Sequence, residues 1–188
     1  MINGSDNGQW NVERLRKLHQ KYITPNDPEW ALTLNLRGCV SSEFATLGHL
    51  TLKTFDSVLD WKLRQQRKRT EKHRSQNNNN LIRELTGAFW RVQHDSPDKL
   101  LEIKLKILQS IPGVGIGVAS TILTLSNPAN FAIIDFRNWK VLYARDKQGF
   151  TVSEYKKYLA DMRKLASQLC CDVQEIDFIL WKEFETLP

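Results

Sequence analysis

The sequence predicts an all-α protein, on three observations. Apolar residues recur at helical spacing in several segments, as Leu52, Phe55 and Leu59 do. Segments with strand-like alternation are scarce, and residues that favour helix starts, such as Asn11 and Asp172, precede apolar runs. With 188 residues, 41% of them hydrophobic, the chain can form one domain with a substantial core.

The expected helices follow one another along the chain. The first covers residues 11–22, and one or two helices lie within 44–63. The next covers 81–92, and another starts at 96–98 and includes 100–108. One helix follows Gly115, and the last three cover 136–144, 153–169 and 172–184. Residues 24–28 contain two Pro and predict a turn, and the Asn tract at 77–80 predicts a flexible loop. We therefore expect a single domain over 1–188, with a central lobe at about 81–145, completing helices at 1–60 and 146–188, and a mobile basic, Asn-rich segment at 62–80.

Composition excludes several classes of protein. No apolar run reaches the roughly 18 residues of a membrane-spanning helix, so no membrane partner is expected. The first residues lack the basic region and apolar stretch of a secretory signal. Three cysteines, Cys39, Cys170 and Cys171, do not make a paired disulfide framework. We expect a reducing setting, the cytoplasm, with association with the nucleoid if the source is bacterial.

Positive charge is concentrated in one block. The chain has 27 Lys and Arg against 21 Asp and Glu, a formal charge of +6. Residues 62–74 hold seven basic residues and one acidic residue, so this block alone carries +6 and the rest is neutral overall. Such a block favours contact with a polyanion, and Arg67, Lys68 and Arg69 are its candidate phosphate contacts. A solvated helix face or a mobile loop is the alternative.

The string Ile111-Pro112-Gly113-Val114-Gly115 is the most specific motif, and it joins two apolar helices. Pro112 ends the first helix, and Gly113 can adopt the positive φ of a tight turn. Gly115 leaves backbone amides uncovered at the start of the next helix, where the helix dipole favours an anion. The motif predicts a site for the DNA backbone, made by Gly113, Val114, Gly115, Ile116 and Gly117. A plain helical hairpin and a turn that binds a small phosphate ligand stay open.

This motif and the residues after it resemble the helix-hairpin-helix DNA glycosylase superfamily. In that superfamily a Leu-Pro-Gly-Val-Gly hairpin is followed at a fixed interval by an apolar pair and the catalytic Asp. Here Ile133 and Ile134 precede Asp135, which stands 24 positions after Ile111. The resemblance covers about residues 100–145 and is most like adenine glycosylases and small bacterial proteins with the 8-oxoguanine glycosylase fold. It implies two helical lobes that flank a cleft for a base flipped out of duplex DNA.

Asp135 has a structural and a chemical interpretation. It precedes an expected helix, so its side chain can serve as the N-cap, a contribution of about 1 kcal/mol. A carboxylate fixed at that place can also stabilise the positive charge that develops on the sugar when a base leaves, or activate water. Given the hairpin and the interval, the sequence favours the catalytic role.

Two departures from the superfamily define the expected chemistry. Bifunctional members carry a Lys near the start of the second hairpin helix, where this chain has Gly117, which implies hydrolysis without strand cleavage. Lys140, five positions beyond Asp135, points away from it on a helix. Near the C-terminus only Cys170 and Cys171 are present, so no four-cysteine iron–sulfur cluster is expected. No metal site is expected either, because the histidines lack metal-ligand spacing: His19, His49, His73 and His94.

The leading interpretation is a monofunctional DNA glycosylase of the base excision repair type. Asp135 is the catalytic residue, and Arg137 and Lys140 add phosphate contacts. The expected protein is a monomer without a cofactor; a monovalent cation at the hairpin stays open. The rival is a DNA-binding module without catalysis, which a filled cleft would favour, whereas an aromatic-lined pocket beside Asp135 would favour the enzyme. Oxidised guanine, mispaired adenine, alkylated purines and a hypermodified base remain open as substrates.

Overall fold

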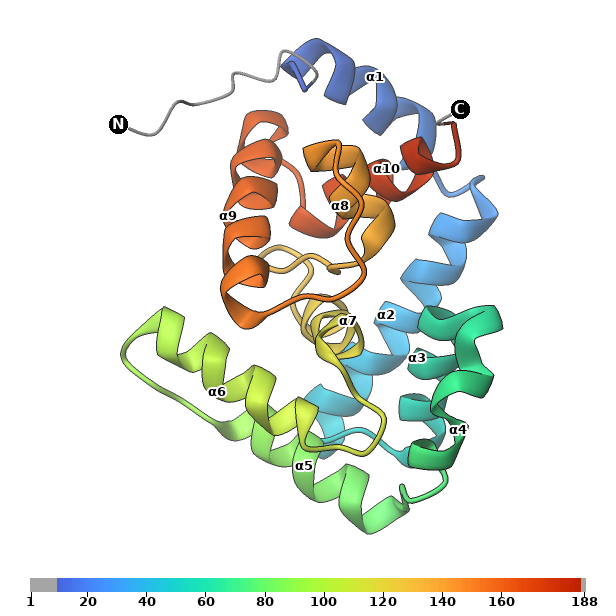
Figure 1. The fold of residues 1–188 in the computed structure, drawn as a ribbon, viewed down its shortest axis with the longest axis vertical. Coiled ribbons are helices and arrows are strands. Elements are labelled where there is room, and N and C mark those ends of the chain that lie inside the picture. The colour runs from blue at the N-terminus through green and yellow to red at the C-terminus, as the bar shows by residue number, and fades with distance from the viewer. Residues whose placement is uncertain (1–9, 187–188) are drawn as a thin grey trace.

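The computed structural model describes residues 10–186, apart from the side chains at positions 65, 67 and 69. Within that range all regular secondary structure is helical and no strand is present, which confirms the all-α prediction (Figure 1). The helices are α1 (Val12–Tyr22), α2 (Pro28–Leu47), α3 (Leu52–Leu63), the short 3-10 helix η1 (Arg64–Gln66), α4 (Arg67–Arg74), α5 (Asn79–Arg91), α6 (Pro97–Gln109), α7 (Ile116–Ser126), α8 (Phe136–Tyr143), α9 (Val152–Leu169) and α10 (Val173–Phe184).

The helix starts that the sequence indicates are confirmed. The Asn11 side chain accepts a hydrogen bond from the amide of Arg14, and Ser96 caps α6 ahead of a Pro in its first turn. Asp172 forms a capping box with Glu175 at the start of α10. These local signals were readable because each depends on residues only three positions apart.

Helix α2 begins far earlier than the sequence suggested. Residues 24–28 were expected to form only a turn, and the first helix after it was placed within 44–63. Instead Asp27 accepts hydrogen bonds from the amides of Glu29 and Trp30, and Pro28 takes the first helical position. The prediction missed a helix of 20 residues that buries Trp30, Leu36, Val40 and Phe44.

The segment at 62–80, expected to be mobile with a loop at 77–80, is mostly helical. The end of α3, η1 and α4 occupy it up to Arg74, and α5 begins at Asn79. The asparagines have separate structural roles that their repetition concealed. The Asn78 side chain caps α5, and the Asn77 side-chain amide donates to the carbonyl of Pro112 across 3.1 Å.

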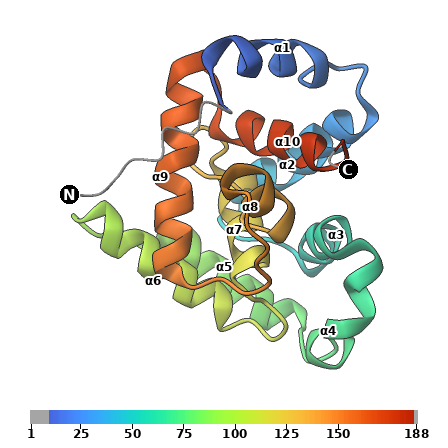
Figure 2. The same cartoon turned by 45° about the horizontal axis from the view of Figure 1, so that its top comes forward.

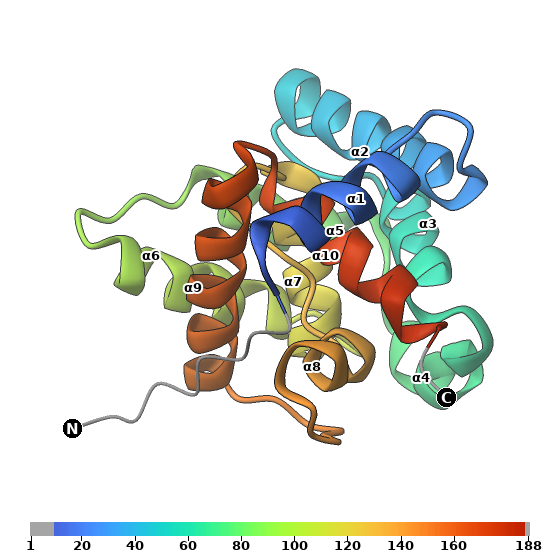
Figure 3. The ribbon, with the colours of Figure 1, turned by 90° about the horizontal axis from the view of Figure 1, so that it is seen from above.

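Helix contacts fall into two groups. In the α7 group, α7 packs against α2, α3 and α6, while α5 pairs with α6 and α3 (Figure 1). In the α10 group, α10 packs against α1, α8 and α9, and α1 lies along α10 (Figure 2). The chain thus groups its first helix with its last three, as the view from above also shows (Figure 3). One cluster of buried apolar residues spans both groups, from Leu15 to Leu180 in sequence, so they share a core.

Helix α7 is buried on all sides and lies in the middle of the molecule (Figure 1). Every residue from Val118 to Leu125 is buried, and the hydroxyls of Ser120, Thr121 and Thr124 donate to carbonyls of the same helix. Its N-terminus is therefore held in a fixed place relative to both groups. In the described residues, no helix has the length and apolar character needed to cross a membrane.

Candidate active site between α3, α8 and α10

A pocket of about 350 Å³ lies where the two helix groups meet. The α7 group contributes residues of α2, α3 and η1 to its wall, and the α10 group contributes residues of α8 and α10. Four aromatic side chains line it: Trp61, Phe136, Phe178 and Trp181. Asp135 also lines this pocket, so the predicted catalytic residue stands beside an aromatic-lined space.

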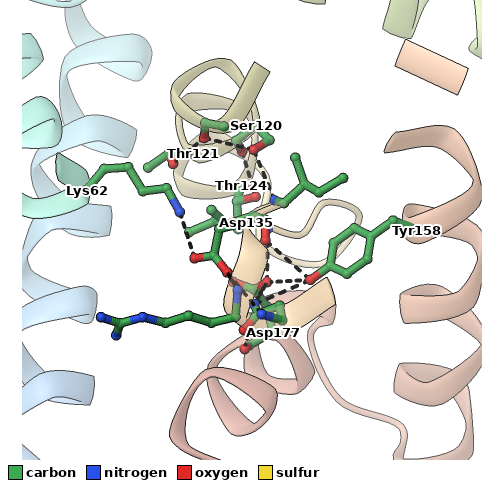
Figure 4. A network of polar contacts seen from close by, with 12 residues as sticks. Lys62, Ser120, Thr121, Thr124, Asp135, Tyr158 and Asp177 are labelled. Carbon is green, nitrogen blue, oxygen red and sulfur yellow. Dashed lines mark hydrogen bonds and ion pairs between the residues drawn. The ribbon is translucent and has the colours of Figure 1, made fainter. Parts of the chain in front are cut away.

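Asp135 caps α8 as the sequence predicts. Its Oδ1 accepts hydrogen bonds from the amides of Arg137 and Asn138, each at 3.0 Å. Its Oδ2 lies 3.0 Å from Nζ of Lys62, which reaches the carboxylate from α3 (Figure 4). Both oxygens are thus held, one by the helix start and one by a cation.

The extended segment before Asp135 is fixed by side chains from three helices (Figure 4). The amide of Ile134 donates to Oγ of Ser120 on α7, and the amide of Ile133 donates to Oδ1 of Asp177 on α10, both at 3.1 Å. From α9, the Tyr155 hydroxyl donates to the carbonyl of Ala132. Buried backbone groups that are satisfied in this way position the carboxylate that follows them.

Asp177 is a buried carboxyl that sequence reasoning missed. Its Oδ1 accepts hydrogen bonds from the Asn138 side-chain amide at 2.7 Å and from the Tyr158 hydroxyl at 2.9 Å. Burial, reinforced by the neighbouring Asp135 carboxylate, raises the pKa of Asp177 to about 7. An Asp inside an apolar helix gives no sequence signal of this role, because its partners come from α8, α9 and the segment before Asp135.

Asp177→Asn should flatten the pH dependence of stability between about pH 4 and 7. The carboxyl has a pKa of about 3.9 in an unfolded chain, but about 7 in the fold, so folding retains a proton across this interval. The stability due to this group is fully present below about pH 4 and is lost as the pH rises through about 7. Urea unfolding of both proteins at several pH values measures the effect. An unchanged pH slope in the Asn variant would exclude Asp177 as its source.

Lys62 is the second site residue that the sequence misplaced. It belongs to the basic block, but its side chain is only 14% exposed and ends in the pocket, paired with Asp135. Gly117 lies beside it: a Cβ added there would stand 4.0 Å from Cε of Lys62. The chain thus supplies from α3 an amine next to the position where Gly117 offers none. The partners are 73 residues apart in sequence, so no local pattern indicates the pair.

The turn between α6 and α7 has the predicted backbone, with one correction. Gly113 has a φ of 82°, in the region that favours glycine. The amide of Val114 donates to the carbonyl of Ile111 at 3.0 Å and its side chain is buried, so Val114 cannot offer that amide to a phosphate. In the described part of the chain, the amides of Gly115, Ile116 and Gly117 have no such acceptor, as expected in the first turn of a helix.

The other predicted phosphate contacts lie in different surroundings. The Arg137 guanidinium lies over the rings of Phe136, Trp181 and Phe184 at 5.5–5.7 Å from their centroids, and Arg137 lines the pocket. Lys140 is on the same helix and forms an ion pair with Asp146 at 3.0 Å. Arg137 is therefore placed toward the pocket, and Lys140 toward the solvent.

The basic block is partly neutralised within the chain. Besides Lys62, Arg64 pairs with Glu29, and Arg74 pairs with Asp56 and Asp60. Lys68 is exposed, whereas the side chains of Arg67 and Arg69 lie outside the described residues. The α4 end of the block lies against the turn, because a Cβ at Gly113 would stand 3.2 Å from Cγ of Arg74.

Replacing Arg67, Lys68 and Arg69 together with Ala should weaken binding to all duplexes alike. It should also reduce the slope of log affinity against log salt by up to about 3, near one for each phosphate that these side chains neutralise. Titrations of one duplex at several salt concentrations measure the slope. A slope that does not move would show that this part of the block is only solvated.

One cluster brings together side chains of metal-ligand type that the sequence spacing did not indicate. His19 of α1, Cys171 and Glu175 bring their ligand atoms within 4.8 Å of one another. Burial raises the pKa of the Cys171 thiol to about 12, which keeps it protonated when no cation is near. These three residues could hold a metal ion, but none of them lines the pocket.

Comparisons of the chain with protein-family models, curated proteins and solved structures found no match.

Proposed function

We propose that the protein is a DNA N-glycosylase that removes a damaged, mispaired or modified base from duplex DNA. One observation carries the proposal: a carboxylate held at a helix start lies on the wall of an aromatic-lined pocket, between two helix groups. The helix-hairpin-helix resemblance, from Ile111 to Asp135, points to the same activity. The two helix groups would be the lobes that flank the base-accepting cleft.

The chemistry rests on Asp135. Breaking a base–sugar bond builds positive charge on C1′ and O4′ of the sugar, and a fixed carboxylate nearby stabilises that charge. Two amides and a cation already hold the Asp135 oxygens, so little reorganisation is needed when the charge develops. Oδ2, which pairs with Lys62, can also orient a water molecule toward the sugar, whereas Oδ1 already accepts two amides.

The pocket suits a flat, polar ring. Its volume of about 350 Å³ lies in the range of small-molecule sites, about 300–1,000 Å³. Trp61, Phe178 and Trp181 line the pocket, and aromatic side chains of this kind are the ones on which a flipped base stacks. Among the described residues, the buried Trp61 Nε1 and Gln174 Nε2 have no hydrogen-bond partner, and either could donate to the edge of a base only after its side chain moves, because both atoms are shielded from solvent.

DNA binding is assigned to the turn before α7. The amides of Gly115, Ile116 and Gly117 stand at the N-terminus of an apolar, buried helix, where the dipole attracts a phosphate. Ser120 on the same helix holds the segment before Asp135, so a phosphate bound there would be in a fixed register with the carboxylate. Binding of this kind contacts the DNA backbone and not its sequence.

The rival function, a DNA-binding module without catalysis, predicts a filled cleft. The pocket beside Asp135 favours the enzyme. A panel of duplexes that each carry one lesion, treated with alkali after incubation, tests the proposal because alkali cleaves the strand wherever a base has been removed. We expect cleavage of at least one duplex. Duplex binding without release of any base would leave the module as the better function.

A further inference from the structure

The Lys62 side chain reaches the pocket from α3 and ends at Asp135. Long basic side chains usually extend their charged ends to water, but that of Lys62 is 14% exposed and that of Asp135 is 19% exposed. The adjacent Trp61 and Leu63 line the same pocket, so this end of α3 forms part of its wall. A primary amine and a carboxylate thus share the space that the proposed function assigns to the sugar.

A second pair in the chain shows what a structural role alone would require. Asp27 caps α2 through the amides of Glu29 and Trp30, and its Oδ2 lies 2.9 Å from Nζ of Lys182. The Lys182 and Asp27 side chains are 14% and 12% exposed, so cap, cation and burial all match the pair at Asp135. Neither residue lines the pocket. The pocket is therefore what distinguishes Lys62 from a lysine that only neutralises a cap.

We propose that Lys62 is a nucleophile that forms a covalent bond to the sugar and lets the protein cut the DNA strand. This inference rests on the proposed glycosylase function and goes beyond the hydrolysis expected from Gly117. That expectation depended on the absence of an amine at position 117, but the amine of Lys62 lies in the adjoining space. A Cβ at position 117 would stand 3.4 Å from the carbonyl oxygen of Ile134 and 4.0 Å from Cε of Lys62, so this position borders the Lys62 side chain.

The reaction balances without an oxidant or a reductant. Asp135 accepts a proton from the Lys62 ammonium, 3.0 Å away, and the amine lone pair attacks C1′. The C1′–N bond to the base breaks, and the base leaves with that electron pair and gains a proton. The C1′–O4′ bond then opens, O4′ gains a proton, and C1′ becomes doubly bonded to the Lys62 nitrogen as an imine.

Strand cleavage follows from the imine. The imine acidifies the C2′ hydrogen; removal of this proton by a base expels the 3′ phosphate with its electron pair. Water then hydrolyses the imine, which releases an unsaturated aldehyde and restores the Lys62 amine. Asp135 is suited to carry the proton because its Oδ2 lies 3.0 Å from the Lys62 nitrogen.

The test uses a duplex with a preformed abasic site, so that it does not depend on which base is excised. Borohydride reduces the imine to a stable amine and locks the protein to the DNA. We expect an adduct whose attachment maps to Lys62 by peptide mass spectrometry. In Lys62→Arg, which keeps a cation for Asp135 but offers no comparable nucleophile, trapping should fall at least about 100-fold, as expected when a catalytic nucleophile is removed. Lys182→Arg, the matched control, should trap within about twofold of the unaltered protein.

A duplex with a tetrahydrofuran abasic analogue, which has no aldehyde, measures binding separately. Tight binding to it together with no adduct on the abasic duplex would overturn the nucleophile and leave the glycosylase proposal standing. An adduct that maps elsewhere, or that persists in Lys62→Arg, would also overturn it. Failure of the unaltered protein to bind either duplex would instead overturn the proposed function itself.

Discussion

Gly115→Asp should reduce duplex affinity at least about 100-fold while the protein stays folded. A carboxylate at this position would stand where the first-turn amides of α7 are proposed to hold a phosphate. Two negative charges about 4 Å apart repel by about 4 kcal/mol at an effective dielectric constant of 20, which corresponds to roughly a thousandfold in affinity. A duplex titration, with circular dichroism as the check on folding, measures both quantities.

The fold should tolerate this change without strain. Gly115 has a φ of −90° and a ψ of 179°, which any residue can adopt, and a Cβ there would meet nothing within 4 Å. Gly115 is the N-cap of α7, a position that Asp favours, so stability should hold or rise by a few tenths of a kcal/mol. A gain in stability together with weaker binding is difficult to explain by misfolding.

Two controls separate charge at this site from size and from charge elsewhere. Gly115→Asn has the same shape and caps as well as Asp, but it is neutral and should bind far better than Gly115→Asp. Gly149→Asp adds the same charge at an exposed glycine whose Cβ would also meet nothing within 4 Å. If all three variants bind like the unaltered protein, the turn does not contact DNA.

The features predicted correctly from sequence are those that depend on near neighbours. The positive φ of Gly113 and the Asp135 cap each follow from residue types within a few positions. Apolar periodicity located α9 and α10 to within one residue. The Asp27-Pro28 pair carried the same kind of signal for α2, a cap followed by Pro, but the neighbouring Pro25 and Asn26 favoured a turn.

The polar partners at the site were beyond the reach of sequence reasoning. In the sequence, Lys62 counts only as one charge in a basic run. It pairs with Asp135, 73 residues away, and this pairing depends on how α3 packs against α7. Asp177 accepts a hydrogen bond from the amide of Ile133, which is 44 residues away in sequence. The charge count therefore overstated the number of basic side chains that are free to contact DNA. The largely buried side chains of Lys62 and Arg74 form ion pairs with Asp135 and Asp60.

Asp135→Asn should reduce base excision by about 100-fold or more, the decrease seen when one preorganised electrostatic group is removed. The Asn oxygen can still accept the amides of Arg137 and Asn138, so the cap on α8 is retained. DNA affinity should hold or rise, because a negative charge near the phosphates is gone. Single-turnover excision and duplex binding, measured on the same lesion, separate the two effects.

The same substitution should also cost stability, because the Asn amide would face the Lys62 ammonium in place of an oxygen. Removing a hydrogen bond to a charged group costs about 1.5–3 kcal/mol, and solvent reduces this because Asp135 is 19% exposed. Asp27→Asn is the matched control, since it keeps the helix cap and disrupts the same kind of lysine pair outside the pocket. Both variants should lose similar stability in urea, but only Asp135→Asn should lose excision. Equal activity in the two would leave Asp135 as a helix cap and favour the DNA-binding module.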